Sequence, residues 1–150
     1  MIGINTTISS PAGGAVGIGF AVPIDTARRV LPELLTTGEV RRGWIDVRPV
    51  QLTPRLARDI SAPVASGLLV SEAIRGGNAD AAGLRGGSRA GRLGRSVFRI
   101  GGDIIVEVDG VPVSNIADLF SSLEDNKPGE TVQVVYFRGG SRRTASITLS

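Results

Sequence analysis

The sequence of 150 residues contains no cysteine and no histidine. Without cysteine, the chain has no disulfide, no cysteine-bound iron–sulfur cluster and no thiol nucleophile. Without histidine, it lacks the base of Ser-His-Asp and Cys-His catalysis and the commonest zinc ligand. These absences exclude most hydrolase mechanisms, and an enzyme built from this chain alone would have to use carboxylates, Lys127, Tyr136 or backbone dipoles. We expect no catalytic residue, no metal site and no cofactor.

Lysine and long apolar runs are also scarce. Lys127 is the only lysine, so arginine provides almost all of the 17 basic residues that oppose 14 acidic ones. The net charge of +3 is small, and nucleic-acid binding needs a clustered basic face rather than a global surplus. The apolar runs are far shorter than the ~20 residues of a membrane span, and the first residues lack the pattern of a signal peptide. We expect neither a nucleic-acid partner nor membrane insertion.

Glycine, by contrast, is abundant, with 21 of 150 positions, and it separates short β-branched runs in the way that turns do. Residues 1–24 predict two strands around a turn at 9–14. Apolar residues at helical spacing then predict a helix with Asp25 as its N-cap and Gly38 at its C-terminal end. Pro32 should kink this helix or delay its start, because proline disrupts a helix interior.

From residue 43 onward, strand patterns and turn signals predict a small α+β domain. The segment from Trp44 to Val50 predicts a strand, and its Pro49 favours a sheet edge because proline has no N–H for the ladder. Thr53 and Pro54 are typical of an N-cap and a first helical position. The other expected elements are strands over 67–74, 96–100, 103–108, 131–138 and 142–149, and helices over 79–84, capped by Asn78, and over 115–125.

The most basic stretch spans residues 85–99, which hold five arginines and no acidic residue. Proteins that bind single-stranded nucleic acid add aromatic stacking to positive charge, and Phe98 is the only aromatic residue in this stretch. Arg-Gly-Gly triplets at 75–77, 85–87 and 138–140 adjoin predicted strand and helix ends. We therefore favour turns and a solvated loop over RNA contacts.

Three carboxylates, those of Asp103, Glu107 and Asp109, lie close enough in the sequence for a hard-cation site to be weighed. Glu107 and Asp109 would share one face of a strand, yet Asp109 and Gly110 together are a hairpin-turn signal. We interpret all three as ordinary surface carboxylates.

Six short motifs occur in a characteristic order. They are Arg-Gly-Trp-Ile-Asp-Val at 42–47, Gly-Leu-Leu-Val at 67–70, Ala-Asp-Ala-Ala-Gly-Leu at 79–84, Gly-Asp-Ile-Ile at 102–105, Asp-Gly at 109–110 and Lys-Pro-Gly at 127–129. In this order they resemble the PDZ domains of HtrA-type (DegP-like) serine proteases. Residues 3–6 and 17–23 likewise resemble the end of the trypsin-like protease domain of that family.

This resemblance implies that the chain corresponds to a C-terminal fragment of such a protease. Residues 1–24 would be a remnant of the protease barrel, 25–42 a linker helix and 43–150 the PDZ domain. The implied fold is α+β: a five- to six-stranded, partly open barrel with two short helices, preceded by a two-strand and helix remnant of a trypsin-like β-barrel. Because two strands cannot close a barrel, we expect residues 1–22 to be mobile or to pair with another chain.

The catalytic His, Asp and Ser of the family precede the segment matched here. The resemblance therefore implies that this chain has no proteolytic activity, while a full-length parent would be a trypsin-like serine endopeptidase. The habit of the family would place that parent in the bacterial periplasm, the cell envelope or another extracytoplasmic space.

The resemblance also implies a peptide-binding site. A PDZ domain binds a peptide as an added strand at an open sheet edge beside a helix. Residues 44–47 would form the carboxylate-binding loop, whose successive backbone N–H groups make a nest for the ligand's C-terminal carboxylate. Residues 47–50 would pair with the peptide, and Arg42 could supply a positive charge. The implied peptide-binding residues are Arg42, Gly43, Trp44, Ile45, Asp46, Val47, Arg48, Leu119 and Leu123, with the two leucines lining the pocket beside Ile45 and Val47.

Asp46 departs from the family pattern, which usually has glycine at this position. Aspartate adds a Cβ and a negative charge close to the expected anion. If its side chain points into the nest, repulsion should weaken the capture of a C-terminus, with Arg42 or Arg48 compensating.

We interpret the chain as a peptide-binding module that recognises C-terminal or unfolded hydrophobic segments and thereby selects substrates for, or regulates, a protease domain. Two alternatives stay open. In the first, the chain holds neighbouring domains or subunits together without binding free peptides, with the 85–99 insertion as the contact. Self-association through the edge strands or the N-terminal segment is a further possible partnership. In the second, the activity to be assigned is the endopeptidase activity of the parent, which this chain cannot perform alone.

Overall fold

The computed structural model describes residues 2–8 and 19–150. They belong to two compact units, Met1–Arg41 and Arg42–Ser150. Within the described ranges, no helix combines the length and the apolar character needed to cross a bilayer.

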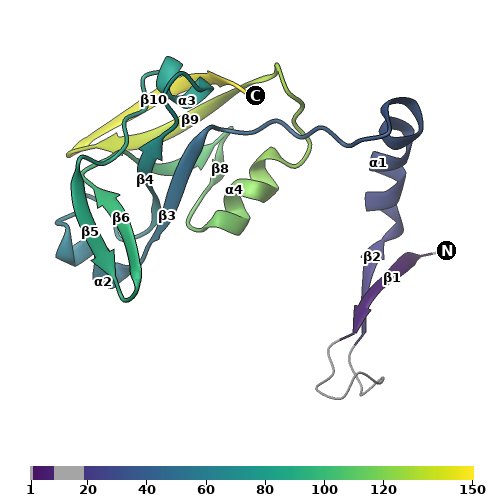
Figure 1. The fold of residues 1–150 in the computed structure, drawn as a ribbon, viewed down its shortest axis with the longest axis horizontal. Helices are drawn as coiled ribbons and strands as arrows, with labels where there is room; N and C mark the ends of the chain where they lie inside the picture. Colours follow the sequence, from purple (N-terminus) through teal and green to yellow (C-terminus); the bar gives the residue numbers. More distant parts are fainter. Residues whose placement is uncertain (1, 9–18) are drawn as a thin grey trace. The chain divides into compact units, whose positions relative to one another are not determined.

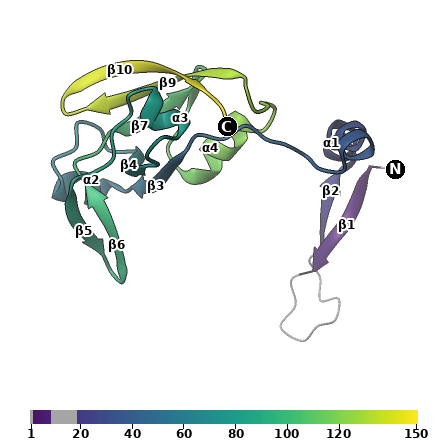
Figure 2. The ribbon, with the colours of Figure 1, turned by 45° about the horizontal axis from the view of Figure 1, so that its top comes forward.

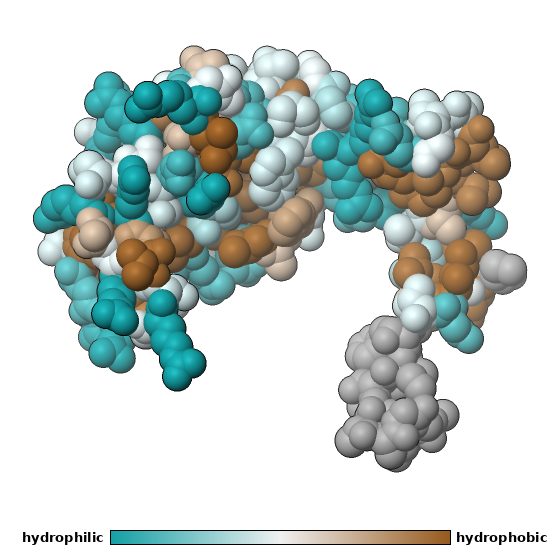
Figure 3. All heavy atoms as spheres, in the orientation of Figure 1, coloured by the Kyte–Doolittle hydropathy of each residue, from teal (hydrophilic) through white to brown (hydrophobic). Residues whose placement is uncertain are grey.

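The N-terminal unit contains an antiparallel strand pair and one helix (Figure 1). Strand β1 (Gly3–Ile8) pairs with β2 (Gly19–Pro23), and helix α1 (Ile24–Thr37) follows directly. The two predicted strands are confirmed and pair with each other, whereas the turn predicted at 9–14 lies outside the described residues. None of the residues of α1 is buried, and the helix shows hydrophobic surface in the space-filling view (Figure 3).

Helix α1 begins earlier than the sequence predicts. Pro23 takes the N-cap position, and Asp25 lies in the first turn, where the helix dipole favours a carboxylate. The prediction of Asp25 as N-cap is therefore wrong, and Pro32 lies inside the helix without delaying its start. Gly38 ends the helix as predicted: its φ is 77°, and its N–H donates to the carbonyl of Leu34 at 3.0 Å.

The C-terminal unit is built on a six-stranded antiparallel sheet with the order β10-β9-β7-β4-β3, in which β8 pairs with β7 (Figures 1 and 2). Its strands are β3 (Val47–Leu52), β4 (Gly67–Ala73), β7 (Ile104–Val108), β8 (Val111–Pro112), β9 (Thr131–Arg138) and β10 (Ser141–Thr148). The sheet is open, with β3 and β10 at its two edges. Past the ends of these strands, Trp44 and Ser150 exchange backbone hydrogen bonds of 3.2 and 3.1 Å. The expected α+β class with a partly open sheet is confirmed.

Three short helices and a separate hairpin complete this unit. The helices are α2 (Pro54–Asp59), α3 (Asn78–Ala81) and α4 (Ile116–Leu123), and the hairpin consists of β5 (Arg89–Leu93) and β6 (Ser96–Ile100). As predicted, Thr53 caps α2, because its side chain accepts a hydrogen bond from the N–H of Leu56. Asp109 and Gly110 form the predicted turn, with φ values of 47° and 79°.

The 85–99 stretch differs from the solvated loop that its glycines and arginines predict. It holds the antiparallel hairpin β5–β6, in which Arg92 lies opposite Val97. Strand β6 matches the predicted strand at 96–100, but β5 is a strand that the sequence did not predict. The burial of Phe98, which is only 7% exposed, anchors the hairpin on the sheet.

The two faces of the sheet are covered by different elements. Successive residues of a strand point to opposite faces, and the side chains of the sheet accordingly divide between two hydrophobic clusters. Val70 and Ile105 pack with Leu119 of α4 in one cluster. Leu69 packs with Phe98 of β6 in the other. Helix α4 and the hairpin β5–β6 therefore lie on opposite faces of the same sheet.

The expectation that Asp103 is a surface carboxylate is wrong. Its side chain is 1% exposed, and its two oxygens accept hydrogen bonds of 2.8 and 2.7 Å from the guanidinium of Arg138. The backbone N–H of Arg85 donates a third bond at 2.8 Å. The hydrogen bond with Asp103 raises the pKa of Arg138. Because Asp103 precedes β7 and Arg138 ends β9, the ion pair joins two neighbouring strands of the sheet.

Candidate functional site

Strand β3 leaves one edge of the sheet open. Within the described part of the chain it pairs with β4 alone, so the backbone groups of its outer edge have no strand partner. Pro49 lies in this strand, as the predicted edge position requires. Helix α4 runs beside β3 in both ribbon views (Figures 1 and 2). An open strand edge next to a helix is the geometry needed to add a further strand.

The loop that leads into β3 is tied to the C-terminal end of the chain. The N–H of Gly43 donates to the carbonyl of Asn126 at 2.9 Å, and Trp44 exchanges its two backbone bonds with Ser150. Position 43 requires glycine, because a Cβ there would lie 2.8 Å from the Leu149 Cβ and 2.9 Å from the backbone carbonyl oxygen of Lys127. The loop is therefore held in place before any ligand binds.

Two further loop amides are used internally. Asp46 donates its N–H to the Oδ1 atom of Asn78 at 2.8 Å, and Val47 donates its N–H to the carbonyl of Ile45 at 2.8 Å. Among the amides from Gly43 to Val47, this leaves the Ile45 N–H without an acceptor in the described structure. The nest of successive free amides that the resemblance implies is thus reduced to one free N–H and one that makes a local bond.

The carboxylate of Asp46 faces the start of α3 and the end of the chain. It accepts a hydrogen bond from the N–H of Asn78 at 3.1 Å and another from the hydroxyl of Ser150 at 3.1 Å. Gly77 makes room for it, since a Cβ at that position would lie 2.7 Å from the Asp46 Cβ. The repulsion predicted for Asp46 depended on a side chain pointing into the nest, and the side chain is bonded elsewhere.

The prediction that Asn78 caps α3 is wrong. Gly77 takes the N-cap position, and Asn78 is the first residue of the helix. Its side chain instead bridges to the loop: besides accepting the Asp46 N–H, its Nδ2 donates to the carbonyl of Trp44 at 2.6 Å. A side chain in α3 therefore fixes the backbone on both sides of Ile45.

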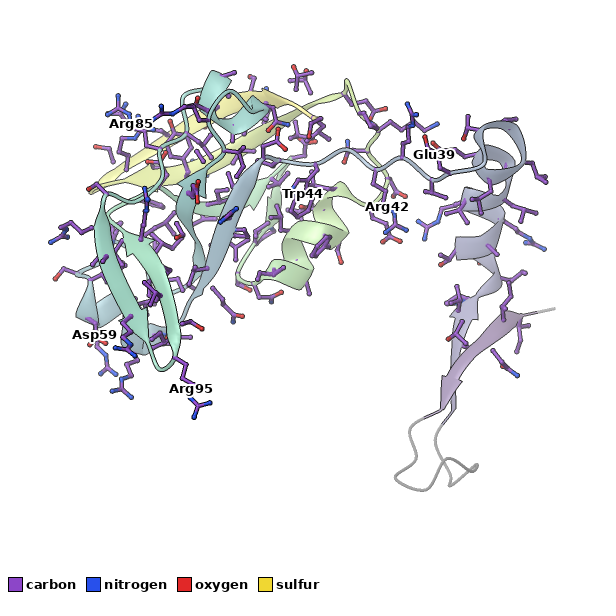
Figure 4. All side chains as sticks on the ribbon, in the orientation of Figure 1. Glu39, Arg42, Trp44, Asp59, Arg85 and Arg95 are labelled. Carbon is purple, nitrogen blue, oxygen red and sulfur yellow. The ribbon has the colours of Figure 1, made fainter. Side chains whose placement is uncertain are left out.

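An aromatic pair joins this loop to α4. The rings of Trp44 and Phe120 stack with their centroids 4.9 Å apart and their planes inclined by 28°, and Trp44 lies beside α4 where β3 begins (Figure 4). Phe120 is 56% exposed and Ile116, one helical turn away, is 39% exposed. Both lie within the predicted helix over 115–125, but the sequence did not assign them to the site. We call the open edge of β3 together with Trp44, Ile116 and Phe120 the β3–α4 site.

The start of α4 is fixed by a network of short polar side chains. The Asn115 side chain accepts the N–H of Asp118 at 2.9 Å, and the Asp118 carboxylate accepts bonds from the hydroxyl and the N–H of Ser114 at 2.6 and 2.9 Å. The bond from the Ser114 hydroxyl is the main reason that the pKa of Asp118 lies below its ordinary value. This cap sets where the exposed face of α4 begins.

The apolar residues that the sequence assigned to the site do meet, in the core beneath the β3–α4 site. They share one hydrophobic cluster and are all buried: Ile45, Val47, Leu119 and Leu123. The two arginines assigned to the site are exposed, whereas Asp46 is half-buried. Arg48 lies 3.6 Å from the carboxylate of Glu72, and Arg42 makes no ion pair within the described residues. That these residues bind peptide stays a prediction.

The PDZ domain family matches residues 43–149, which covers the sheet, the loop and α4. The chain belongs to the PDZ domain family. The PDZ fold and the family that the motifs predicted are therefore confirmed.

Relatives extend the likeness beyond the PDZ domain. The periplasmic pH-dependent serine endoprotease DegQ of Escherichia coli (strain K12) is 32% identical over 149 residues, which are 99% of this chain and 30% of DegQ. The chloroplastic Protease Do-like 1 of Arabidopsis thaliana is 38% identical over 151 residues, 99% of this chain and 32% of the relative. The chain thus spans about a third of the length of these relatives.

Solved structures of HtrA-type proteins are also similar to this chain. The HtrA-type protease AlgW with decapeptide matches with a TM-score of 0.78 and 30% identity, over 100% of this chain and 42% of that one. The HtrA3 PDZ domain bound to a phage-derived ligand (FGRWV) matches with a TM-score of 0.55 over 73% of this chain and 86% of that one, and at 23% identity it shows the fold alone. The resemblance to HtrA/DegP-like proteases that the motifs predicted is confirmed over the whole chain.

Proposed function

We propose that the β3–α4 site binds hydrophobic peptide segments, above all free C-termini, as an added strand. The observation that carries this proposal is the open edge of β3 beside exposed apolar side chains of α4. Strand addition gives affinity through main-chain hydrogen bonds and specificity through the side-chain contacts on either side. The similar protease AlgW was solved with a decapeptide, which supports the proposal by likeness.

The terminal carboxylate of the peptide would accept the free N–H of Ile45. The Val47 N–H would join it by giving up its local bond to the Ile45 carbonyl. Arg42, which is exposed, would add a positive charge next to the carboxylate. Opposite Pro49 the peptide gains one hydrogen bond fewer, because proline has no N–H to donate.

In a longer protease of the DegQ or DegP type, this module would present bound segments to the protease domain or regulate it. The chain itself would have no peptidase activity, because it contains no histidine to serve as the general base. Relatives named as periplasmic support an extracytoplasmic location. Cleavage of casein by this chain would overturn the proposed absence of activity.

The binding proposal is tested by fluorescence anisotropy with a labelled decapeptide that ends in valine or phenylalanine, as the free acid and as the amide. Amidation should weaken binding about tenfold or more, because a hydrogen bond to a charged group contributes about 1.5–3 kcal/mol. Arg42→Gln should weaken binding of the free acid, and Arg143→Gln, the same change on β10, should not. Equal binding of acid and amide would contradict carboxylate capture. Failure of both peptides to bind would instead favour a domain that only holds protein parts together.

A further inference from the structure

A groove of about 580 Å³ opens on the face of the sheet opposite α4. It lies between β3 and β4 on one side and the hairpin β5–β6 on the other, and its lining includes Arg48, Val50, Glu72, Val97 and Arg99. Val97 is 73% exposed, so the groove offers an apolar contact as well as charge. We call this space the hairpin groove.

The charge in and around the hairpin groove is mostly positive. Arg48 and Arg99 line it, and Arg92 lies on the same face of the hairpin, because it is paired with Val97, a lining residue. Glu72 is the acidic residue in the lining, and it lies 3.6 Å from Arg48, which offsets it. Arg92 and Arg99 make no ion pair among the residues that the structure describes, so their charges are uncompensated.

A peptide strand added to β3 would face both sides of the sheet. Side chains of a strand alternate between its two faces. Val47 belongs to the cluster that contains Leu119 of α4, whereas Leu52 belongs to the cluster that contains Phe98 of the hairpin. If the C-terminal residue of the peptide and the residue two before it face α4, the residues one and three before the end face the hairpin side.

We propose that the hairpin groove is a second subsite for the same peptide and that it selects acidic side chains at the positions one and three residues before the C-terminus. This proposal rests on the proposed function, because it needs a peptide paired with β3. The carboxylates would meet Arg48, Arg92 and Arg99, and the aliphatic part of a glutamate side chain would pack on Val97.

The same arginines could attract any polyanion, but the groove lacks what a single-stranded nucleic acid requires. Its one aromatic residue, Phe98, is only 7% exposed and packs into the core. Base stacking needs an accessible aromatic face. Arg95, at the tip of the hairpin, points away from the domain (Figure 4). An acidic peptide held along β3 fits the groove better than a nucleic acid does.

Two decapeptides that end in the same hydrophobic residue test this subsite. One has glutamate at the positions one and three residues before the end, and the other has glutamine, which is nearly the same size without the charge. We expect the wild-type chain to bind the glutamate peptide about three- to tenfold more tightly at low ionic strength, and the ratio should approach one at about 1 M salt, where the Debye length is about 3 Å. Calorimetric titration measures both affinities.

Matched variants separate the groove from the overall charge. Arg92→Gln/Arg99→Gln should remove the preference for glutamate while leaving the affinity for the glutamine peptide unchanged. Arg142→Gln/Arg143→Gln, which removes the same charge on β10, should keep the preference. Thermal unfolding checks that both variants fold, and Arg99→Lys should retain most of the preference.

Several results would overturn the subsite. The wild-type chain would then bind the glutamate and glutamine peptides equally. Alternatively, the groove variant and the β10 variant would lose the preference for glutamate to the same extent. Competition by an oligothymidylate as strong as that by the glutamate peptide would show a general polyanion surface instead. Failure of both peptides to bind in free-acid form would contradict the proposed function itself, which keeps the two failures apart.

Discussion

The two edges of the sheet differ in what lies next to them. Strand β3 has an open backbone edge beside exposed apolar side chains of α4, including Phe120. Strand β10 also lies at an edge, but Arg142 and Arg143 are exposed along it. Charged side chains on an edge strand discourage pairing with another chain. An open edge alone therefore does not make a binding site, because the apolar side chains beside it determine which edge can hold a peptide.

The largest effect is expected from the ion pair between the two edges. Asp103→Asn leaves the partly buried Arg138 without its counter-charge and should lower the free energy of unfolding by about 3 kcal/mol. Because the pair joins β7 to β9 in the middle of the sheet, its loss should destabilise the strands toward both edges. Urea unfolding monitored by circular dichroism measures this loss.

Glu107→Gln is the matched control for that change. It breaks the exposed 3.4 Å pair between Glu107 and Arg142, and it should cost less than about 1 kcal/mol. Equal losses in the two variants would show that burial of Asp103 does not determine the strength of the central pair.

The next effect is confined to the β3 edge. Asp46→Gly removes two hydrogen bonds, to Asn78 and Ser150, and adds backbone freedom to the unfolded chain. We expect a loss of about 2 kcal/mol in the free energy of unfolding. The affinity for a C-terminal peptide should stay within about twofold, because the carboxylate does not face the ligand, and a twofold change is only about 0.4 kcal/mol.

Asp46→Asn separates charge from hydrogen bonding at the same position. It keeps the oxygen that accepts the Asn78 N–H and should cost about half as much stability as Asp46→Gly. Markedly tighter peptide binding by either variant would show that the Asp46 charge does repel the ligand.

Phe120→Ala tests whether the apolar wall defines the β3 edge as a site. A peptide on the β3 edge would cover part of the exposed Phe120 ring, and burial of that apolar area is worth about 1 kcal/mol, so the variant should bind peptide about three- to tenfold more weakly. The unfolding free energy should fall by about 0.5–1.5 kcal/mol, because the variant also loses the stack of Phe120 on Trp44. Val111→Ala, which shortens another exposed apolar side chain on β8, should leave the affinity unchanged, and an equal loss in both would contradict the assignment of the wall to α4.

The smallest effect concerns the pH dependence of the α4 cap. The pKa of Asp118 is lowered in the folded state, chiefly by the Ser114 hydroxyl, so its carboxylate stabilises the fold at pH values above the ordinary pKa of 3.8. That contribution is lost as the pH falls through the lowered pKa. The stability difference between wild type and Asp118→Asn should therefore be constant near neutral pH and shrink in acid. A difference that grows as the pH falls would contradict the role of the cap.

Much of the sheet could be predicted because its signals are local. Leucine and valine content predicted β4, alternation of apolar and polar residues predicted β7, turn signals bounded β9 and β10, and Pro49 placed β3 at an edge. The turn at Asp109 and Gly110 could be predicted since few other residues adopt positive φ. One family motif, at 42–47, covers the loop of the β3–α4 site, and the resemblance implied that the predicted helix over 115–125 lies beside it.

The features that the sequence did not predict depend on partners far away in the chain. Asp103 is buried because Arg138 reaches it, and the Asp46 carboxylate is occupied because Asn78 and Ser150 fold next to it. Strand β5 has the sequence Arg-Ala-Gly-Arg-Leu, in which apolar and polar residues do not alternate, so the sequence alone has no strand signal and the pairing with β6 determines the structure. Sequence patterns do not encode such long-range contacts, and they are the ones that shape the site.

The central claim, that a peptide adds to the β3 edge, is tested most directly by backbone amide chemical shifts of the chain titrated with a hydrophobic-ended free-acid peptide. We predict that the largest shifts occur at the amides of Ile45 and Val47, continue along β3 and include Phe120 of α4. Shifts that gather along β10, or that leave Ile45 and β3 unchanged at saturating peptide, would contradict this claim.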